Sequence, residues 1–541
     1  MQFFYLCLMR RGTWLTGMCA ALAICATARG ENAGSSDPIL DLFVQKGFVT
    51  QQEADKVRVE AEALRTNELQ MAQMPESKWN IGKGFKNVEL YGDVRLRYED
   101  RKASDTADNG LELQRWRYAV RFGLRGDLFD DFYYGFRLDT SSNPRSSFVT
   151  FGTAGTTGPF GKSGAGVNIG QVYLGWRPES WVNLTLGKMP MPLYTTPMVW
   201  NPNISPEGAA EQFNYTVGEA DFFATFGQFL YADYGPAAAS GGNILGVSTP
   251  TAGDDIFQLA WQAGLKYNFT TNVNAKIAAT LYEYIGLHSD SNTLGSLSYN
   301  PYVNLSPYYG DPYVGEGAAL LYPGNAAGYN SGSPANSTTG GYNSAGPAPF
   351  NQVGLNHILV LEIPFEFNFK VKKLDARVFG DFAYNLEGAM RAQDAANAYS
   401  LLLSQAPTAS TKSSPFQPQT SDVKAYQIGF AVGSSGSLGM VSGSNVRRHG
   451  WEFRTYWQHI EQYSLDPNIL DTDFFNGLEN MEGYYTALSY GLTDNLIGSV
   501  RYGHANRINN KLGTGGNSQD ISQINPVNKY DIIQVDLTLK F

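Results

Sequence analysis

The feature that most constrains this chain is an alternation of apolar and polar side chains that starts at Val88 and returns at the C-terminus. In the segment 88–98 one face is apolar and the other is mostly charged. The apolar face consists of Val88, Leu90, Val94, Leu96 and Tyr98. The last residues, up to Phe541, alternate in the same way. A period of two over many residues is typical of β-strands that separate an apolar from a polar environment.

The connections between the predicted strands alternate between short and long. Short turns lie at 127–131, 178–180, 219–220, 270–271, 370–373 and 493–495, and a longer Gly/Ser connection covers 434–448. The remaining connections are long and rich in Gly, Ser, Asn, Pro and Tyr, the longest being 287–352. Outer-membrane barrels have short periplasmic turns and long outer loops. We therefore predict an all-β transmembrane barrel of about 16 antiparallel strands, with a range of roughly 14–18, over residues 88–541.

Composition agrees with a barrel and argues against other classes. After residue 28 the sequence contains no stretch of about 18 apolar residues, so a transmembrane helix is not expected. Gly (58), Tyr (32) and Phe (31) are abundant, whereas charged residues make up only 17%. Alternation of lipid-facing and lumen-facing residues produces such a balance. The formal net charge of −10 argues against nucleic acid as a partner, because that binding needs a basic surface.

The first 28 residues are predicted to be a secretory signal peptide. Arg10 and Arg11 precede an apolar stretch, and Ala26-Thr27-Ala28 fits a small-x-small cleavage site. The chain has three cysteines inside this segment: Cys7, Cys19 and Cys25. The mature chain is thus expected to lack disulfides and thiol sites. Without the two arginines, 38 basic residues face 50 acidic ones, a net charge of −12. Export and a barrel together predict the bacterial outer membrane as the location.

Residues 37–75 are predicted to form a periplasmic α-helix. Thr50-Gln51-Gln52-Glu53 is a capping box, in which the Thr hydroxyl and the Glu carboxylate satisfy free backbone N–H groups. The apolar residues that follow are spaced three and four apart: Ala54, Val57, Ala61 and Leu64. This stripe is compatible with a short coiled coil and equally with one amphipathic helix on the barrel. Contact of the helix with peptidoglycan is a further possibility.

A cluster of arginines has the parity that faces the lumen. The set lies on three consecutive predicted strands and consists of Arg95, Arg97, Arg115, Arg117, Arg121, Arg125 and Arg137. An Arg that faces hydrocarbon at mid-depth costs about 2–4 kcal/mol, which favours the inward orientation. The planar guanidinium suits carboxylates and phosphates. We interpret the set as a pore-lining basic strip, with the alternative that inward acids such as Glu89, Asp93 and Asp139 neutralise it.

The connection 189–211 is unusually rich in proline, which favours a fixed shape. We hypothesise that it folds into the lumen as a constriction and places Glu207 and Glu211 opposite the arginine strip. Such a transverse field would favour dipolar solutes over apolar ones. The alternative is a proline-rich loop at the surface.

Motifs for catalysis and metal binding are missing from the sequence. The Gly161-Lys162-Ser163 triplet lacks the glycine that a phosphate-binding loop needs at position 156. The five histidines do not have metal-ligand spacing. We therefore expect no enzymatic activity, no metal and no cofactor.

Several short segments resemble the putative porin family of Gram-negative bacteria. They are Gly187-Lys188-Met189, residues 200–208, Asp471-Thr472-Asp473-Phe474-Phe475, Glu482-Gly483-Tyr484 and Leu492-Thr493-Asp494-Asn495-Leu496. The similarity extends over about residues 80–541. It implies a trimeric outer-membrane channel. The segment after Phe475 departs from the family pattern, which has a glycine run there.

Three functions fit the sequence. The first is a porin for passive diffusion of small hydrophilic solutes and ions. The second is a channel selective for anions, phosphate or organic acids, with the arginine strip as a ladder. The third is a barrel that is not a channel and has an adhesive or structural role. Expected partners are outer-membrane lipids, small polar solutes and two further copies in a homotrimer.

Overall fold

The computed structural model describes residues 85–105, 110–152, 166–232, 256–285, 357–393, 419–512 and 527–541, together with Lys46 and Thr514. Two compact units are distinguished, Met1–Gln73 and Met74–Phe541. The predicted signal peptide 1–28 and nearly all of the predicted helix 37–75 lie outside the described residues, so both stay predictions.

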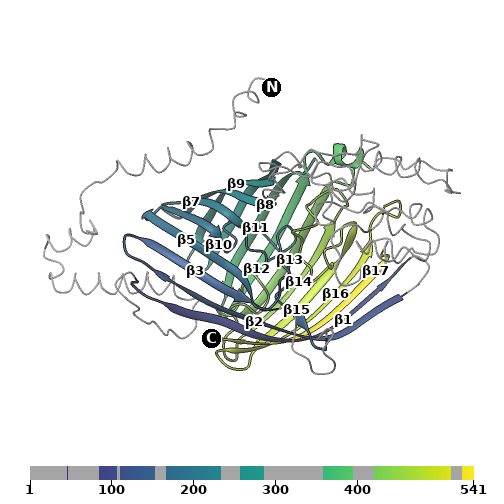
Figure 1. Ribbon diagram of the computed structural model, residues 1–541, viewed down its shortest axis with the longest axis horizontal. Helices are drawn as coiled ribbons and strands as arrows, with labels where there is room; N and C mark the ends of the chain where they lie inside the picture. Colours follow the sequence, from purple (N-terminus) through teal and green to yellow (C-terminus); the bar gives the residue numbers. More distant parts are fainter. Residues whose placement is uncertain are drawn as a thin grey trace, which may run out of the picture. The chain divides into compact units, whose positions relative to one another are not determined.

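The second unit is an antiparallel sheet closed by pairing of its first and last strands (Figure 1). The strands are β1 (Glu89–Ser104), β2 (Gly110–Asp127), β3 (Phe132–Asp139), β4 (Val149–Thr150), β5 (Asn168–Glu179), β6 (Val182–Lys188), β7 (Glu207–Val217), β8 (Ala220–Ala232), β9 (Ile256–Thr270), β10 (Val273–Ile285), β11 (Leu359–Val371), β12 (Leu374–Asn385), β13 (Lys424–Ser434), β14 (Trp451–Ile460), β15 (Met481–Gly491), β16 (Leu496–Arg507) and β17 (Lys529–Lys540). A short helix covers 388–393.

The barrel has sixteen strand positions. Strand β4 has only two residues and pairs with β2 beyond the point where β3 stops pairing with it, so β3 and β4 share one position. Strand β1 pairs with β17 over twelve residues, from Asp93–Lys540 to Ser104–Lys529. Closure leaves no free sheet edge, which a membrane-spanning sheet requires. The predicted all-β barrel of about 16 antiparallel strands is confirmed.

The two faces of the wall differ as the alternation predicts. On β1 and β2, Leu96, Trp116 and Phe122 are 44%, 62% and 39% exposed and point outward. Their sequence neighbours Arg97 and Arg117 point inward and are buried. The other strands repeat this arrangement, with Ile428 and Leu488 among the outward side chains. Apolar groups thus cover the outside and polar groups line the inside.

The connections also follow the predicted pattern. At one end of the barrel neighbouring strands are joined by two to four residues, as between β5 and β6 or β15 and β16. The connection 435–450 between β13 and β14 is the long exception at this end. We call this end the short-turn end and the opposite one the long-loop end. In the described part of the chain, no helix is long and apolar enough to cross a membrane.

Candidate functional site

The seven arginines of the predicted strip all lie on the inner face, on β1, β2 and β3. Each has a carboxylate within 4.0 Å. The pairs are Arg95–Asp93 (3.0 Å), Arg97–Asp536 (2.6 Å), Arg115–Glu99 (2.5 Å), Arg117–Glu99 (3.8 Å), Arg121–Asp93, Arg125–Glu89 (2.7 Å) and Arg137–Asp139 (2.8 Å). The strip is therefore a mixed layer of charges, in which every predicted arginine has an acidic neighbour.

Glu99 is the centre of this layer. Its side chain is fully buried and lies within 4.0 Å of four guanidinium groups. These groups belong to Arg97, Arg101, Arg115 and Arg117. Gln534 on β17 also donates a hydrogen bond to Glu99, at 2.9 Å. A carboxylate with this many donors holds the first, second and last strands together at the point where the barrel closes.

The proline-rich connection, residues 189–206, folds inward and is called the proline loop below. Its residues Met198, Val199 and Trp200 are at most 4% exposed. Gln262 on the inner face of β9 hydrogen-bonds to both backbone groups of Tyr194, at 2.9 Å and 2.8 Å. The loop leaves the wall between β6 and β7 and reaches the inner faces of β9, β11 and β12. It therefore lies across the lumen.

A second inward segment meets the proline loop from the other side. It comprises residues 461–480, between β14 and β15, and is called the aspartate segment below. Its origin is eight strand positions from that of the proline loop, so the two start on opposite walls. Asn201 of the proline loop donates its backbone N–H to the carbonyl of Ile469 at 2.7 Å. The Asn201 side chain donates to the carbonyls of Arg145 and Leu470, at 3.2 Å and 3.4 Å.

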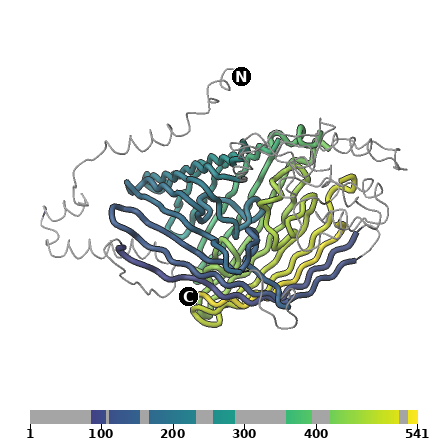
Figure 2. The backbone as a smooth tube through the Cα atoms, in the orientation of Figure 1, coloured from purple at the N-terminus to yellow at the C-terminus, as the bar shows by residue number. Residues whose placement is uncertain are grey.

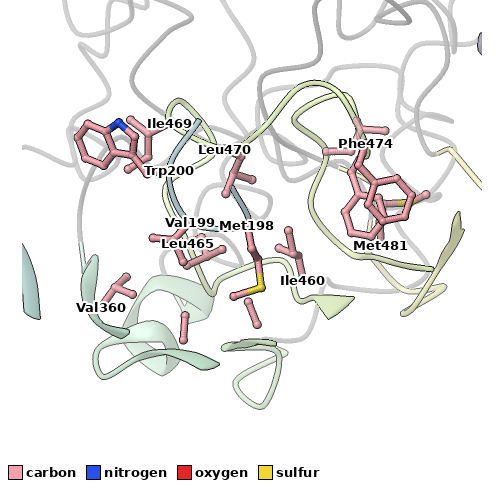
Figure 3. Close-up of a cluster of buried hydrophobic side chains, with 14 of the residues drawn as sticks. Met198, Val199, Trp200, Val360, Ile460, Leu465, Ile469, Leu470, Phe474 and Met481 are labelled. Atoms are coloured by element: carbon pink, nitrogen blue, oxygen red, sulfur yellow. The ribbon is translucent and has the colours of Figure 1, made fainter. Parts of the chain in front are cut away.

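Apolar side chains fill the space where the two segments meet (Figure 3). Met198, Val199 and Trp200 lie beside Leu465, Ile469 and Leu470, with Val360 and Ile460 of the wall close by (Figure 3). All of these side chains belong to one buried cluster. Because burying such groups is favourable by about 1.5–3 kcal/mol each, the cluster holds both segments in place. The lumen is thus bridged by a packed, fixed structure.

The aspartate segment also contacts the arginine strip. Asp473 accepts a hydrogen bond from Arg97 at 2.7 Å, and Asn476 accepts one from Arg101 at 2.8 Å. Burial opposes the charge on Asp473, but the guanidinium of Arg97, followed by those of Arg501 and Arg101, outweighs it and lowers the pKa of Asp473. Asp473 is therefore ionised at neutral pH. Its side chain is 38% exposed, so a permeating solute can reach it.

The neighbouring Asp471 behaves differently. Burial, helped by the negative charge of Asp473, raises the pKa of Asp471 to about 7. The carboxyl group therefore changes charge near neutral pH, although an ordinary aspartate is ionised well below it. Asp473 and Asp471 thus supply one permanent and one pH-dependent negative charge.

Two buried acids of the wall fix the tip of the proline loop. Thr195 donates a hydrogen bond to Glu362 on β11 at 2.6 Å, and Thr196 donates one to Asp381 on β12 at 2.5 Å. Tyr282 on β10 also donates to Glu362, at 2.6 Å. Glu362 and Asp381 are at most 1% exposed, so both hydroxyl groups of the loop tip are bound by buried acceptors of the wall. This acid pair is an anchor for the loop.

Removing both hydroxyl donors should release the loop tip. In the variant T195V/T196V, the acid pair keeps its burial but loses two partners, at a cost of about 1–3 kcal/mol for each buried group left unsatisfied. We expect more frequent current fluctuations in single-channel recordings and faster proteolysis within 189–206. T216V, which removes an exposed hydroxyl bonded to Asp221, is the control and should leave both unchanged. Identical recordings for the double variant and the control would contradict the anchor.

The structure places Glu207 and Glu211 differently from the sequence-based hypothesis. Both belong to β7, not to the loop, which ends at Pro206. In the register they pair with Lys188 and Leu184, whose parity is that of the outward Leu186. Glu207 forms an ion pair with Lys188 at 2.5 Å. Both acids therefore have the outward parity of the wall, and we do not propose them as constriction acids.

The acid that does face the strip from a loop, Asp473, was missed in the sequence. It lies within the segment Asp471 to Phe475, which attracted attention only through a family resemblance. Contacts with Arg97 and Gln534 are separated by 376 and 61 residues, and no local pattern reports them. The sequence signal that could have identified Asp473 is its pairing with Asp471 in a connection at the long-loop end. Within the described ranges, no group of His, Cys, Asp or Glu has the geometry of a metal site.

A family model described as putative porin matches residues 103–541. Among solved structures, the chain is similar to Salmonella typhi OmpF in complex with daunomycin, at 8% identity and a TM-score of 0.39, with 86% of this chain and 100% of that chain covered. It is also similar to Vibrio cholerae OmpT, described as an outer membrane protein, at 8% identity and a TM-score of 0.35, covering 86% and 100%.

A third similar structure is a mutant of the Rh. blastica porin, at 8% identity and a TM-score of 0.34, covering 84% of this chain and 100% of that chain. These structural similarities are too weak to carry an argument about function. No curated protein sequence matches the chain. The family model covers most of the sequence, including every strand from β2 to β17. The chain therefore belongs to the putative porin family.

Proposed function

We propose that this outer-membrane porin lets small hydrophilic solutes and ions diffuse passively, with weak charge selectivity. The observation that supports weak selectivity is the pairing of all seven strip arginines with carboxylates. Closely spaced opposite charges produce a strong local field but little net potential over the lumen. Such a field orients dipolar solutes and disfavours apolar ones. We expect no enzymatic activity.

The constriction in this proposal is the bridge of the proline loop and the aspartate segment. Three supports carry it: the contact of Asn201 with Ile469 and Leu470, the anchor at Glu362 and Asp381, and the ion pair of Asp473 with Arg97. The acidic side of the transverse field is then Asp473, and the basic side is the strip on β1 and β2. Solutes would pass beside this ion pair, within its local field.

Planar-bilayer measurements with purified protein test the proposal. We expect stepwise conductance and a reversal potential near zero in a salt gradient. A strongly anion-selective current that phosphate blocks would favour the alternative, a channel for phosphate or organic acids. A bilayer that stays sealed, although the protein shows the heat-modifiable migration of a folded barrel, would favour an adhesive or structural barrel.

The charge of the constriction should change with pH through Asp471. Burial in the folded structure raises the pKa of Asp471 from 3.8 to about 7 and so favours its protonated form. The packing of the aspartate segment is therefore most stable at low pH. Stability from this group declines as the pH rises from about 4 to about 7, and above that the lumen gains one negative charge. We expect the reversal potential to shift toward cation preference when the pH is raised from about 5 to about 9. D471N should abolish the shift, and a shift that persists would assign it to another group.

Assembly into a homotrimer is part of the proposal. A polar pair in the outer wall supports a lateral protein contact: Gln228 on β8 donates a hydrogen bond to Glu211 at 3.0 Å, on the face that otherwise meets lipid. Charged groups on the lipid face are unfavourable at mid-depth. Cross-linking in mild detergent should give trimers. Trimers that stay intact or become stronger in E211L would show that lipid, not protein, covers this surface. Contact of the N-terminal segment with peptidoglycan also stays a prediction.

A further inference from the structure

The connection 435–450, called the serine turn below, is the exception among the short turns. Its sixteen residues join β13 to β14, although Ser434 and Trp451 lie side by side in the hairpin and need only a two-residue turn. It contains three glycines and four serines before Arg447. Figure 2 shows the yellow-green turns of this region beside the C-terminus, at the short-turn end of the barrel.

Basic side chains of the inner wall hold the backbone of the serine turn. Arg377 on β12, Arg454 on β14 and Lys540 on β17 donate hydrogen bonds to it. The accepting carbonyls are those of Gly439, Met440 and Ser444. From β12 to β17 the wall advances by five strand positions of sixteen. The serine turn therefore bridges nearly a third of the circumference from the inside.

Acidic and hydroxyl groups of the wall complete the attachment. Glu452, which is fully buried, accepts the backbone N–H of Gly443 at 3.1 Å. The hydroxyl of Ser442 lies 3.3 Å from that of Ser489 on β15, which lies 2.7 Å from that of Ser499 on β16. Gly443 has a φ of +78°, and an added Cβ would lie 2.7 Å from the Ser489 hydroxyl oxygen, so only glycine fits this approach. These contacts fix the turn against the wall.

The inner side of the serine turn is buried, whereas its tip is free. Ser437 and Leu438 are at most 9% exposed, and Leu438 packs on Phe379 and Ala431 of the inner wall. Met440 and Val441 at the tip are 53% and 40% exposed. Because the serine turn is attached to the inner wall on one side and its apolar tip is exposed, it narrows the opening at the short-turn end of the barrel.

We propose that the serine turn is a second constriction, at the periplasmic mouth of the channel. It lies in series with the bridge formed by the proline loop and the aspartate segment. Its three cationic neighbours on the wall donate to its backbone carbonyls, which fixes it across the opening and restricts the size of solutes. The inference rests on the proposed channel function and adds a second place where the flow is limited.

Replacing residues 435–450 by Asn-Gly, which forms a tight hairpin turn, tests the proposal. Two comparable resistances in series predict a rise in single-channel conductance of about 1.5- to 2-fold when one is removed. An unchanged conductance in a folded variant would overturn the second constriction. A wild-type barrel that does not conduct would instead overturn the proposed function, so the two failures are distinguishable.

Thiol modification of the tip of the serine turn tests the second constriction without shortening the chain. Residues 29–541 contain no cysteine, so M440C introduces a single reactive site there. A bulky thiol reagent added at the periplasmic side should reduce the conductance of M440C. D494C, in the short exposed turn between β15 and β16, is the matched control and should not respond. An equal response of both variants, or of neither, would overturn the proposal.

The placement of the serine turn is tested separately by a disulfide. S442C/S489C should form one on mild oxidation, because the two hydroxyl oxygens lie 3.3 Å apart. S489C/S499C is the positive control for oxidation, because the hydroxyl oxygens of these two wall residues lie 2.7 Å apart. If the control pair closes and S442C/S489C stays reduced, the turn does not lie against the wall and the second constriction is wrong.

Discussion

Deleting residues 193–205 is expected to raise single-channel conductance by about twofold, because it removes the proline loop from the lumen while the serine turn stays in series. The deletion also removes the contacts of Asn201 with the aspartate segment and the anchor at Thr195 and Thr196. The stems survive, since Lys188 and Glu207 already pair in the register. Planar-bilayer recordings of the deletion and the wild type measure the effect.

A subtler variant separates the presence of the loop from its attachment. N201A keeps the length of the proline loop but removes the side-chain donor to the carbonyls of Arg145 and Leu470. We expect a mean conductance close to the wild type with increased noise. Combining the deletion with the Asn-Gly replacement of the serine turn should exceed either change alone. Wild-type conductance in the deletion, in a barrel that migrates as folded, would refute the constriction.

Replacing Glu99 by alanine is expected to lower the free energy of unfolding by about 3–5 kcal/mol, the range for breaking a buried ion pair from one side. The substitution leaves guanidinium groups from β1 and β2 without their shared carboxylate, including Arg101 at 2.9 Å and Arg115 at 2.5 Å. It also removes the acceptor for Gln534 on β17, where the barrel closes. Unfolding in urea, followed by the loss of heat-modifiable migration, measures the change.

Two further variants test whether the loss of stability in E99A comes from the buried charge of Glu99. E99Q retains an acceptor for Gln534 but loses the charge, so its stability should lie between E99A and the wild type. E112Q breaks the ion pair of Glu112 with Lys102, which lies on the exposed outer rim, and should have no measurable effect because exposed pairs contribute little. Equal stability of E99A and E112Q would show that the buried layer does not hold the closure together.

The wall was predictable because its information is local. The parity of residues 88–98 and the alternating lengths of the connections suffice for the strand count, and the predicted turn at 493–495 lies within the connection 492–495 between β15 and β16. The inward orientation of Arg115 and Arg121 also follows from parity, since the outward face beside them carries Trp116, Val120 and Phe122.

The interior was less predictable because its contacts are not local. Inward folding of the proline loop was hypothesised, but its partners lie on strands far along the chain, as with Thr195 and Glu362, 167 residues apart. Glu207 and Glu211 were placed in the loop because proline density was taken to mark its extent, whereas the hydrogen bonds of β7 begin at Glu207. The glycines and serines of this region predicted only a longer connection, at 434–448. Only the basic side chains of the wall reveal that it is attached.

The contact between Asn201 and Leu470 also constrains the order of assembly. The two residues are 269 positions apart and approach each other from opposite sides of the barrel. They can meet only when β14 and β15 have taken their places, so the bridge is a late event with a high loop-closure cost. A nascent barrel would therefore have a wider, unbridged lumen until its last strands are in place.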